Sequence, residues 1–275
     1  MATRSKQAPQ EAEGVEETAP KPGDAYVQSF ARGLDVIRSF SARTPAQTLS
    51  QVAERTGLTR AGARRILLTL QTLGYVESQD RLFRLTPRIL DLGFAYLSSM
   101  PMWNVAEPVM EALVAQVSES SSAAVLDGTD IVYVLRVPTR KIMRIGLGVG
   151  SRLPAYCTAM GRMLLADLPE DEMLRRLEQS DLQAKTRHTV TEIDALRAKV
   201  EQARRQGWCL VNQELEEGLI AVAAPLVNHA GRTIAALNIS GQVNRTNAKV
   251  MQDTMVPALV AAAREMSRLF SPQLG

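Results

Sequence analysis

The sequence has few of the residues that build disulfide frameworks, metal centres or membrane spans. Its 275 residues include two cysteines and two histidines, and no apolar run reaches the roughly 18 residues of a transmembrane helix. Cys157 and Cys209 are too few for a disulfide scaffold or a cysteine metal site. We therefore expect no metal, no cofactor and no membrane partner, and a reducing cytoplasmic location.

Residues 1–24 have no apolar segment of the kind found in signal peptides. They are rich in Ala, Pro, Glu and Gly, and such a composition buries too little apolar surface to offset the entropy of ordering. The sequence therefore predicts a disordered tail over 1–24.

No recognisable catalytic motif is present either. His188 and His229 stand outside any motif, and the chain has no glycine-rich phosphate loop or metal-spaced cluster. Cys157 precedes a predicted helix, which favours a thiolate, but no partner base accompanies it. We interpret the protein as a non-enzyme, with a Cys157 nucleophile as the rival hypothesis.

The positive charge of the chain is unevenly distributed. Its formal net charge is +3. The segment Tyr26–Met100 alone holds ten arginines, no lysine and five acidic residues, a balance of +5 that leaves the rest near −2. A basic first domain indicates a polyanionic partner, and the larger domain then has a different role.

The first domain has the spacing of a helix-turn-helix. Apolar residues recur at helical spacing over Phe30–Phe40. Thr48 is a candidate N-cap for a second helix, which must end at Gly57 because glycine adopts the left-handed conformation of a tight turn. Thr59 is the next N-cap, and the helix that follows it ends before Gly74. Two short helices joined by a glycine turn are typical of this motif.

The outward positions of that last helix carry no acid. The N-terminal part of such a recognition helix reads base edges in the major groove, and arginine pairs with guanine through two hydrogen bonds. The following strands, near 75–78 and 82–85, predict a wing whose basic residues contact phosphate or the minor groove. The predicted contacts with a double-stranded DNA operator are Thr59, Arg60, Arg64, Arg65, Arg81 and Arg84. The alternative for each arginine is a solvated helix face.

A helix predicted over 87–101 is apolar around most of its circumference. Such a helix needs burial. A second copy of the chain is the favoured cover, because palindromic operators match two-fold dimers. The alternative is packing on the chain's own second domain.

The pattern of the second domain predicts an antiparallel sheet with helices on its faces, an α+β fold in the style of GAF or PAS domains. Hairpin turns are expected at 127–130 and 228–232, and a third strand at Ile142–Val149. The predicted organisation is a disordered tail at 1–24, a winged helix-turn-helix at 25–86, a linker helix at 87–101 and an effector-binding domain at 102–275.

One segment of this domain indicates an anion site. Thr158 is a candidate N-cap, so the N–H groups of Ala159, Met160 and Gly161 would be free to bind an acid. Asn238 and Ser240 share one face of a strand and converge on the same pocket. Arg136 and Arg152 are candidate carboxylate partners. The alternatives are that Thr158 only caps its helix and that Asn238 bonds backbone.

Long motifs resemble those of the IclR family over residues 26–270. They include YVQSFARGLDVIRSF, LTRAGARRILLTLQTLGYV, RLPAYCTAMGRMLLA and ELEEGLIAVAAPL. The resemblance, strongest to regulators of the β-ketoadipate pathway, implies homodimers or dimers of dimers that bind a small carboxylic acid. The implied effectors are protocatechuate, 4-hydroxybenzoate or β-ketoadipate. By position, the implied pocket residues are Ile142, Ile145, Thr158, Ala159, Met160, Asn212, Leu219, Ala221, Asn238 and Ser240.

The sequence departs from this resemblance at one place. Related regulators have Arg-Ser after the ELEEGL motif, whereas this chain has Ile220 and Ala221. The departure implies a different way of recognising the ligand, or a less charged ligand. The sequence leaves open activation or repression, a second domain that only oligomerises, and one that senses an unrelated small molecule.

Overall fold

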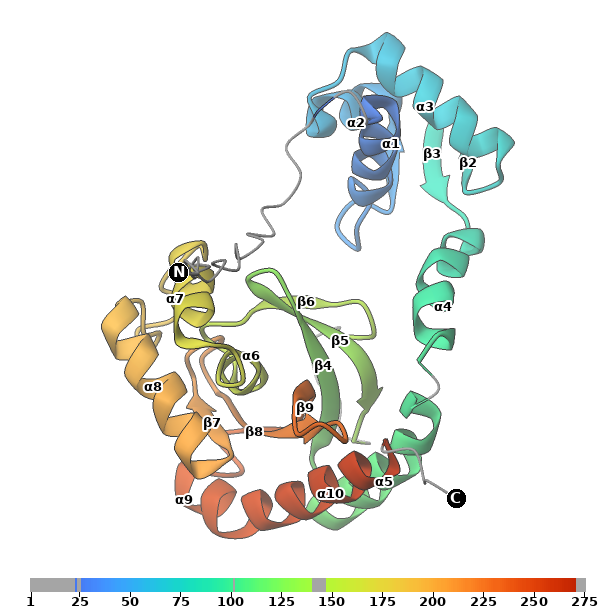
Figure 1. Ribbon diagram of the computed structural model, residues 1–275. Coiled ribbons are helices and arrows are strands. Elements are labelled where there is room, and N and C mark those ends of the chain that lie inside the picture. Colours follow the sequence, from blue (N-terminus) through green and yellow to red (C-terminus); the bar gives the residue numbers. More distant parts are fainter. Residues whose placement is uncertain (1–22, 24–25, 101, 140–146, 271–275) are drawn as a thin grey trace, which may run out of the picture. The chain divides into compact units, whose positions relative to one another are not determined.

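The computed structural model describes residues 23, 26–100, 102–139 and 147–270 (Figure 1). The chain divides into two compact units, Met1–Asp91 and Leu92–Gly275. Almost all of the predicted tail lies outside the described residues. Within the described ranges, no helix is long and apolar enough to cross a membrane.

The first unit combines three helices with a small antiparallel sheet. A core of residues from α1, α2, α3 and β2 holds it together, centred on Val36, Val52 and Leu67. The sheet order is β1-β3-β2. The elements are α1 (Gln28–Arg38), β1 (Ala46–Thr48), α2 (Leu49–Thr56), α3 (Arg60–Thr72), β2 (Val76–Gln79) and β3 (Leu82–Leu85).

The helix boundaries of this unit follow from local capping. Thr48 begins α2 with a reciprocal pair of bonds to Gln51, a capping box. Gly57 ends α2 at φ 64°, a left-handed conformation that glycine adopts without steric cost. Thr59 caps α3 by accepting a hydrogen bond from Gly62 N at 3.1 Å. The three predicted cap and turn positions are confirmed.

The wing is a hairpin with a shorter turn than expected. Its turn residues are Asp80 and Arg81, with φ values of 52° and 67°. Two successive positive φ values match the turn whose twist suits a two-residue hairpin. The strand β1, which the sequence analysis did not predict, pairs with β3 on the side away from β2.

The linker forms a short 3-10 turn, Pro87–Ile89, followed by α4 (Leu90–Ser98). No residue of α4 is buried, and the side chains of Leu90 and Phe94 are 70% and 69% exposed. Near its end, Leu97 packs partly against the core of the second unit. The predicted helix is therefore present, and most of its apolar surface faces solvent.

The second unit is built on one six-stranded antiparallel sheet in the order β6-β5-β4-β9-β8-β7. The strands are β4 (Ser120–Asp127), β5 (Asp130–Val137), β6 (Arg152–Pro154), β7 (Cys209–Asn212), β8 (Leu219–Val227) and β9 (Thr233–Gln242). The helices are α5 (Met102–Val117), α6 (Ala159–Leu165), α7 (Glu170–Glu178), α8 (Ile193–Gln206), α9 (Ala248–Val250) and α10 (Val256–Leu269).

Helices cover both faces of this sheet, α5 and α10 on one and α6 to α8 on the other (Figure 1). The two faces differ in the residues that the strands present. In β9, Leu237 and Ile239 pack under α5 and α10, whereas the alternate positions Asn238 and Ser240 are polar. Neighbouring residues on that second face are small, such as Ala221 on β8. Small and polar residues there leave room for a pocket.

One predicted element differs from the structure. Residues 147–149, the described end of the strand expected at Ile142–Val149, do not form a strand, and a short strand lies instead at Arg152–Pro154. Near the end of the chain, a π-helical segment, Met251–Met255, lies between α9 and α10. The difference at the strand does not change the fold class, which is α+β as predicted.

Candidate functional site

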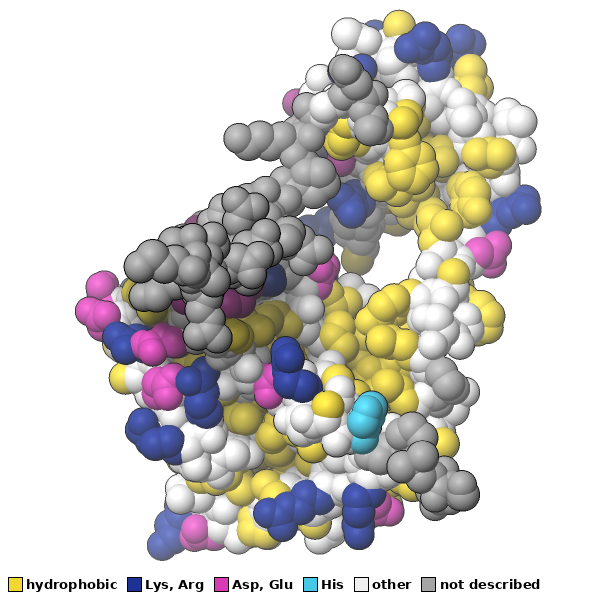
Figure 2. Space-filling model, in the orientation of Figure 1, with side chains coloured by type: hydrophobic (Ala, Val, Ile, Leu, Met, Phe, Trp, Pro, Cys, Tyr) yellow, Lys and Arg dark blue, Asp and Glu magenta, His cyan; other side chains and the backbone are white. Residues whose placement is uncertain are grey.

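The helix α3 presents a basic surface in the first unit. Thr59, Arg60, Arg64 and Arg65 are all exposed, and Figure 2 shows Lys and Arg side chains gathered over this end of the unit. Within the described part of the chain, none of these arginines forms an ion pair. Their charge is therefore available to a polyanion.

The wing extends this surface. Arg81 at its tip and Arg84 on β3 are exposed. Arg81 has a positive φ, which is costly for any residue with a Cβ. A strained arginine at a hairpin tip is the kind of feature that a binding surface retains.

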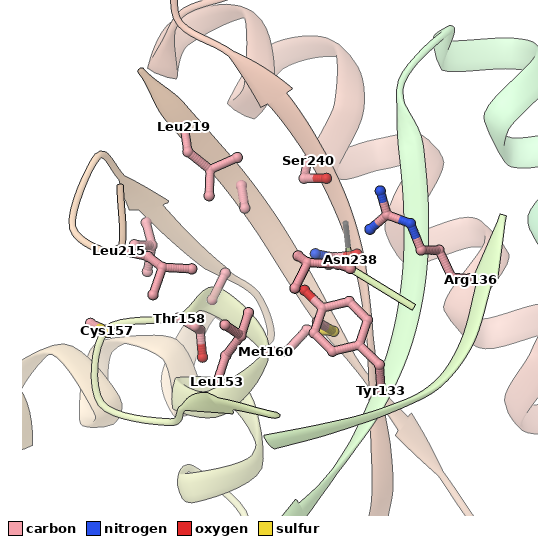
Figure 3. A pocket seen from close by; sticks show the side chains of 14 residues that line it. Tyr133, Arg136, Leu153, Cys157, Thr158, Met160, Leu215, Leu219, Asn238 and Ser240 are labelled. Carbon is pink, nitrogen blue, oxygen red and sulfur yellow. The ribbon is translucent and has the colours of Figure 1, made fainter. Parts of the chain in front are cut away.

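A pocket lies in the second unit between the sheet and α6 (Figure 3). Its lining residues come from the strands β5 to β9, from the start of α6 and from the loops beside them. In Figure 3 the guanidinium of Arg136 points into the cavity from one side, and Leu215 and Leu219 lie across from it. The lining residues are Tyr133, Arg136, Leu147, Leu153, Cys157, Thr158, Ala159, Met160, Val211, Leu215, Leu219, Ala221, Asn238 and Ser240.

One side of this pocket is a group of hydrogen-bond donors. Among the lining residues that the structure describes, Arg136 is the only charged one, and it has no ion-pair or hydrogen-bond partner in the described chain. The Oδ1 atom of Asn238 accepts a hydrogen bond from Ser122 N at 2.9 Å. Asn238 therefore turns its Nδ2 donor toward the cavity, while the bond to backbone fixes its orientation.

Two polar residues in or beside this donor group were not predicted from the sequence. Tyr133 lines the pocket, and burial raises its pKa to about 12, an effect that Arg136 partly offsets. Its hydroxyl therefore stays protonated and able to donate. Ser122 lies between Arg136 and Asn238 in the strand register, and its buried Oγ has no partner among the described residues. Alternation along the strands could have indicated Ser122, which is paired with Arg136 and Asn238, but not Tyr133, because β4 and β5 shift register between them.

Thr158 plays a narrower part than expected. It is the N-cap of α6, as predicted, and its Oγ1 accepts from Gly161 N at 3.2 Å and donates to Pro154 O at 3.0 Å. The N–H of Gly161 is therefore used within the protein, which corrects the expectation that it would bind a ligand. The N–H groups of Ala159 and Met160 remain at the first turn, where a helix has no internal partners.

The structure brings eight of the predicted pocket residues together, namely Arg136, Thr158, Ala159, Met160, Leu219, Ala221, Asn238 and Ser240. It does not place Arg152 there, because this side chain is exposed and pairs with Asp127 at 2.6 Å and Asp130 at 3.1 Å. Asn212 is also exposed, at the end of β7, outside the pocket. Ile142 and Ile145 lie outside the described residues.

The departure from the resemblance at 220–221 affects the pocket at one position only. Ile220 is fully buried on the sheet face that α5 and α10 cover, away from the pocket. Ala221 points the other way and lines the pocket. Substitution at 220 therefore leaves the lining unchanged, whereas the small Ala221 widens it.

Cys157 also lines the pocket, but its chemistry does not suit a nucleophile. Burial raises the pKa of its thiol to about 11, so the thiol is protonated near neutral pH and the reactive thiolate is scarce. Cys157 is therefore not suited to the role of a nucleophile. Among the described residues, no group of three or more His, Cys, Asp or Glu could hold a metal ion.

These two surfaces together define a class of protein. A winged helix-turn-helix with unpaired arginines on its recognition helix is a DNA-binding module, and a donor-lined pocket in a separate α+β unit is a small-molecule site. The combination is that of a DNA-binding transcription regulator with a sensory domain.

Comparisons with known proteins identify the family. Residues 29–80 match the IclR helix-turn-helix domain and residues 94–268 match the bacterial transcriptional regulator IclR C-terminal domain. The chain belongs to the IclR family. This membership confirms the predicted fold class and the prediction of a regulator instead of an enzyme.

Three relatives illustrate the similarity. The chain is 41% identical to the Pca regulon regulatory protein of Pseudomonas putida, over 88% of this chain and 83% of the relative. It is 36% identical to the p-hydroxybenzoate hydroxylase transcriptional activator of Acinetobacter baylyi, over 89% and 92%. The crystal structure of an IclR homolog of Microbacterium hydrocarbonoxydans complexed with 4-hydroxybenzoate has a TM-score of 0.75 and 26% identity, covering 88% of this chain and 98% of that one.

Proposed function

We propose that this protein regulates genes of aromatic-acid catabolism and that a small carboxylic acid bound beside Arg136 is its effector. Arg136, which has no ion-pair partner among the described residues, carries the proposal. With the Asn238 Nδ2 and the Tyr133 hydroxyl it offers three groups that can donate hydrogen bonds, one of them charged, and a carboxylate is an anion with acceptors only. The named functions of the Pseudomonas and Acinetobacter relatives support the aromatic pathway.

The remaining lining suits an apolar ligand body. Leucine, valine and methionine side chains form the wall opposite Arg136, which fits an aromatic ring better than a second charged group. The cavity is narrow, about 40 Å³, room for roughly three water molecules. An aromatic acid enters only when lining side chains change rotamer, so we expect binding to reshape this pocket.

A thermal-shift screen of aromatic and dicarboxylic acids tests the effector. At a hundredfold excess over Kd, a ligand adds about 2.7 kcal/mol to the stability of the folded state, which raises the Tm of a domain of this size by about 5–10 °C. Protocatechuate, 4-hydroxybenzoate and β-ketoadipate are the first acids to include. A flat response to every acid would contradict a small-acid effector.

Arg136→Gln is the matching substitution. Losing a charge-assisted hydrogen bond costs about 1.5–3 kcal/mol, so acid affinity measured by calorimetry should fall about tenfold to a hundredfold, with little change in Tm without ligand. Arg152→Gln is the control, because Arg152 is an exposed, ion-paired arginine outside the pocket. Equal losses of acid affinity in both variants would contradict the proposal that Arg136 binds the carboxylate of the effector.

We further infer that the protein works as a homodimer or a dimer of dimers. Val27 and Phe30 on the first unit are 62% and 69% exposed, and α4 exposes Leu90 and Phe94 to a similar extent. Apolar side chains so exposed at two helices favour a second copy as cover. In sedimentation at micromolar concentration, the wild type should be dimeric or larger and Phe94→Asp smaller. A monomeric wild type would contradict this inference.

A further inference from the structure

A buried ion pair links two walls of the pocket without touching the cavity. Arg162 on α6 is 1% exposed, and its guanidinium donates to both carboxylate oxygens of Glu214, at 2.8 and 2.5 Å. The side chain of Glu214 is 7% exposed. Neither residue lines the pocket. Burying this ion pair costs free energy, because both charges are removed from water.

Each partner is also fixed to its own wall. The Nε of Arg162 donates to Tyr156 O at 2.8 Å, which holds the segment just before Cys157 and Thr158. One turn further along, Ala159 and Met160 line the cavity. The first wall, residues 154–160, is therefore bonded to Arg162.

Glu214 lies in the second wall, residues 213–219, which supplies the lining residues Leu215 and Leu219. Its Oε2 accepts from Val190 N at 3.3 Å, and its backbone oxygen accepts from Thr189 Oγ1 at 2.6 Å. Within the wall, Gln213 Oε1 accepts from Gly218 N at 2.9 Å. The 213–219 wall is thus held by its hydrogen bonds to residues 189 and 190, and the ion pair links it to α6.

We infer that Arg162 and Glu214 are positioning residues that set the separation of the 154–160 and 213–219 walls, and so the size of acid that the pocket accepts. The inference rests on the proposed function, in that this cavity is taken as the effector site. The three donors of Arg162 each reach a different acceptor atom, on both walls, so no other side chain type can hold both walls at once. Ligand entry then depends on rotamers of the lining residues and not on separation of these two walls.

Arg162→Lys in the full-length protein tests the inference. Lysine keeps the buried charge paired but cannot bond both walls. The first readout needs no ligand: backbone hydrogen exchange in 155–160 and 213–219 should speed up about tenfold, with the strands β4 and β9 unchanged. Glu214→Asp, which keeps the pair and shortens one arm, is the second variant if Arg162→Lys fails to fold.

The matched control is Arg204→Lys. Arg204 also makes three hydrogen bonds, to Ala166 O, Leu168 O and Glu201 Oε1, but it joins α8 to the far end of α6 and no pocket wall. It should lower the Tm without changing exchange at 213–219. Exchange at both walls that stays at the wild-type rate in Arg162→Lys and Glu214→Asp would overturn the inference, as would a uniform increase across the domain.

The second readout is the affinity ratio of 2-naphthoate to benzoate. It should rise about tenfold in Arg162→Lys relative to wild type and to Arg204→Lys, since a wider pocket favours the larger ring. A lower Tm with an unchanged ratio means a purely structural pair and overturns the inference. If the wild type binds neither these acids nor the hydroxybenzoates, the proposed effector class is wrong, and the exchange rates alone still decide the role of the pair.

Discussion

The wing tip places two residues with side chains, Asp80 and Arg81, in the left-handed region of backbone space. A non-glycine residue there costs about 1 kcal/mol. Glycine would remove that cost, so the presence of an arginine indicates a benefit elsewhere. Because Arg81 is exposed and free of ion pairs among the described residues, contact with DNA is the benefit that fits.

We therefore expect Arg81→Gly to change stability and DNA affinity in opposite directions. The first unit should gain about 0.5–1 kcal/mol in its free energy of unfolding from relief of strain. Operator affinity should fall severalfold, and the slope of log affinity against log salt should shrink by about 0.9 for one lost phosphate contact. Chemical denaturation and fluorescence anisotropy measure the two quantities.

Asp80→Gly is the control for this substitution. It relieves the same kind of strain but removes a negative charge, so stability should rise without loss of DNA affinity. If Arg81→Gly instead binds DNA as the wild type does, the wing contributes only structure.

Single residues also show how far the sequence predicted the pocket. Arg136 and Arg152 are both arginines beside predicted strands, yet only Arg136 lines the cavity. Arg152 forms ion pairs with Asp127 and Asp130 on the neighbouring hairpin. These ion pairs depend on the register in which the strands pair. A register shift between Ala123 and Ala124 similarly hides which face Tyr133 occupies. In a strand with a bulge, the alternation of residues alone does not predict on which face of the sheet a side chain lies.

Among the elements, α3 carries the DNA-binding hypothesis. Its exposed Arg64 and Arg65 lie in the first half of the helix, where a recognition helix contacts base edges in the major groove. Each of Arg64→Ala and Arg65→Ala should weaken operator binding by about 1–3 kcal/mol if it contacts a base, or reduce the salt slope by about 1 if it contacts phosphate.

The control for these variants is Arg205→Ala, an exposed arginine on α8 in the other unit. Anisotropy titrations at fixed salt compare the three variants. Unchanged affinity in both α3 variants would remove this helix from the interface.

The helix α6 depends on a glycine for its packing. A Cβ at Gly161 would lie 2.2 Å from Ala155 O and 2.3 Å from Ala155 Cα, both backbone atoms that cannot move aside easily. Gly161→Ala should therefore destabilise the second unit by about 3 kcal/mol or more, the range of severe overpacking. The first unit should keep its own unfolding transition.

Gly148→Ala is the matched control, because a Cβ there meets no atom of the described chain within 4 Å and Gly148 is not among the glycines with a positive φ. Calorimetry of the two variants gives the comparison. A Gly161→Ala protein as stable as Gly148→Ala would mean that the 154–161 turn is looser than its contacts indicate.

Element boundaries were predictable where local chemistry sets them. Thr48, Thr59 and Thr158 each cap a helix as expected, because capping uses residues within three positions. The three-residue strands β1 and β6 were not predicted, because they exist only through pairing with distant strands. Arg162 was missed for the same reason, since its partner Glu214 is 52 positions away.

At the scale of the whole molecule, two units have separate chemistries. One exposes arginines without ion pairs among the described residues, which we propose for DNA, and the other has a pocket lined by donors, which we propose for a carboxylate. The sequence predicted both units because charge, caps and hairpin turns are local signals. Binding of an acid regulates transcription only if it changes the affinity for DNA, and this coupling is reciprocal by thermodynamic necessity.

The most direct test measures DNA affinity with and without the acid. A labelled duplex selected by the protein from a random pool is titrated by fluorescence anisotropy at fixed salt, using the acid that gives the largest thermal shift. We expect the acid to change the Kd for DNA about 5–150-fold, with no such change in Arg136→Gln, whose affinity without acid stays that of the wild type. An acid that stabilises the protein and leaves the Kd for DNA unchanged would contradict the role of this pocket in regulation.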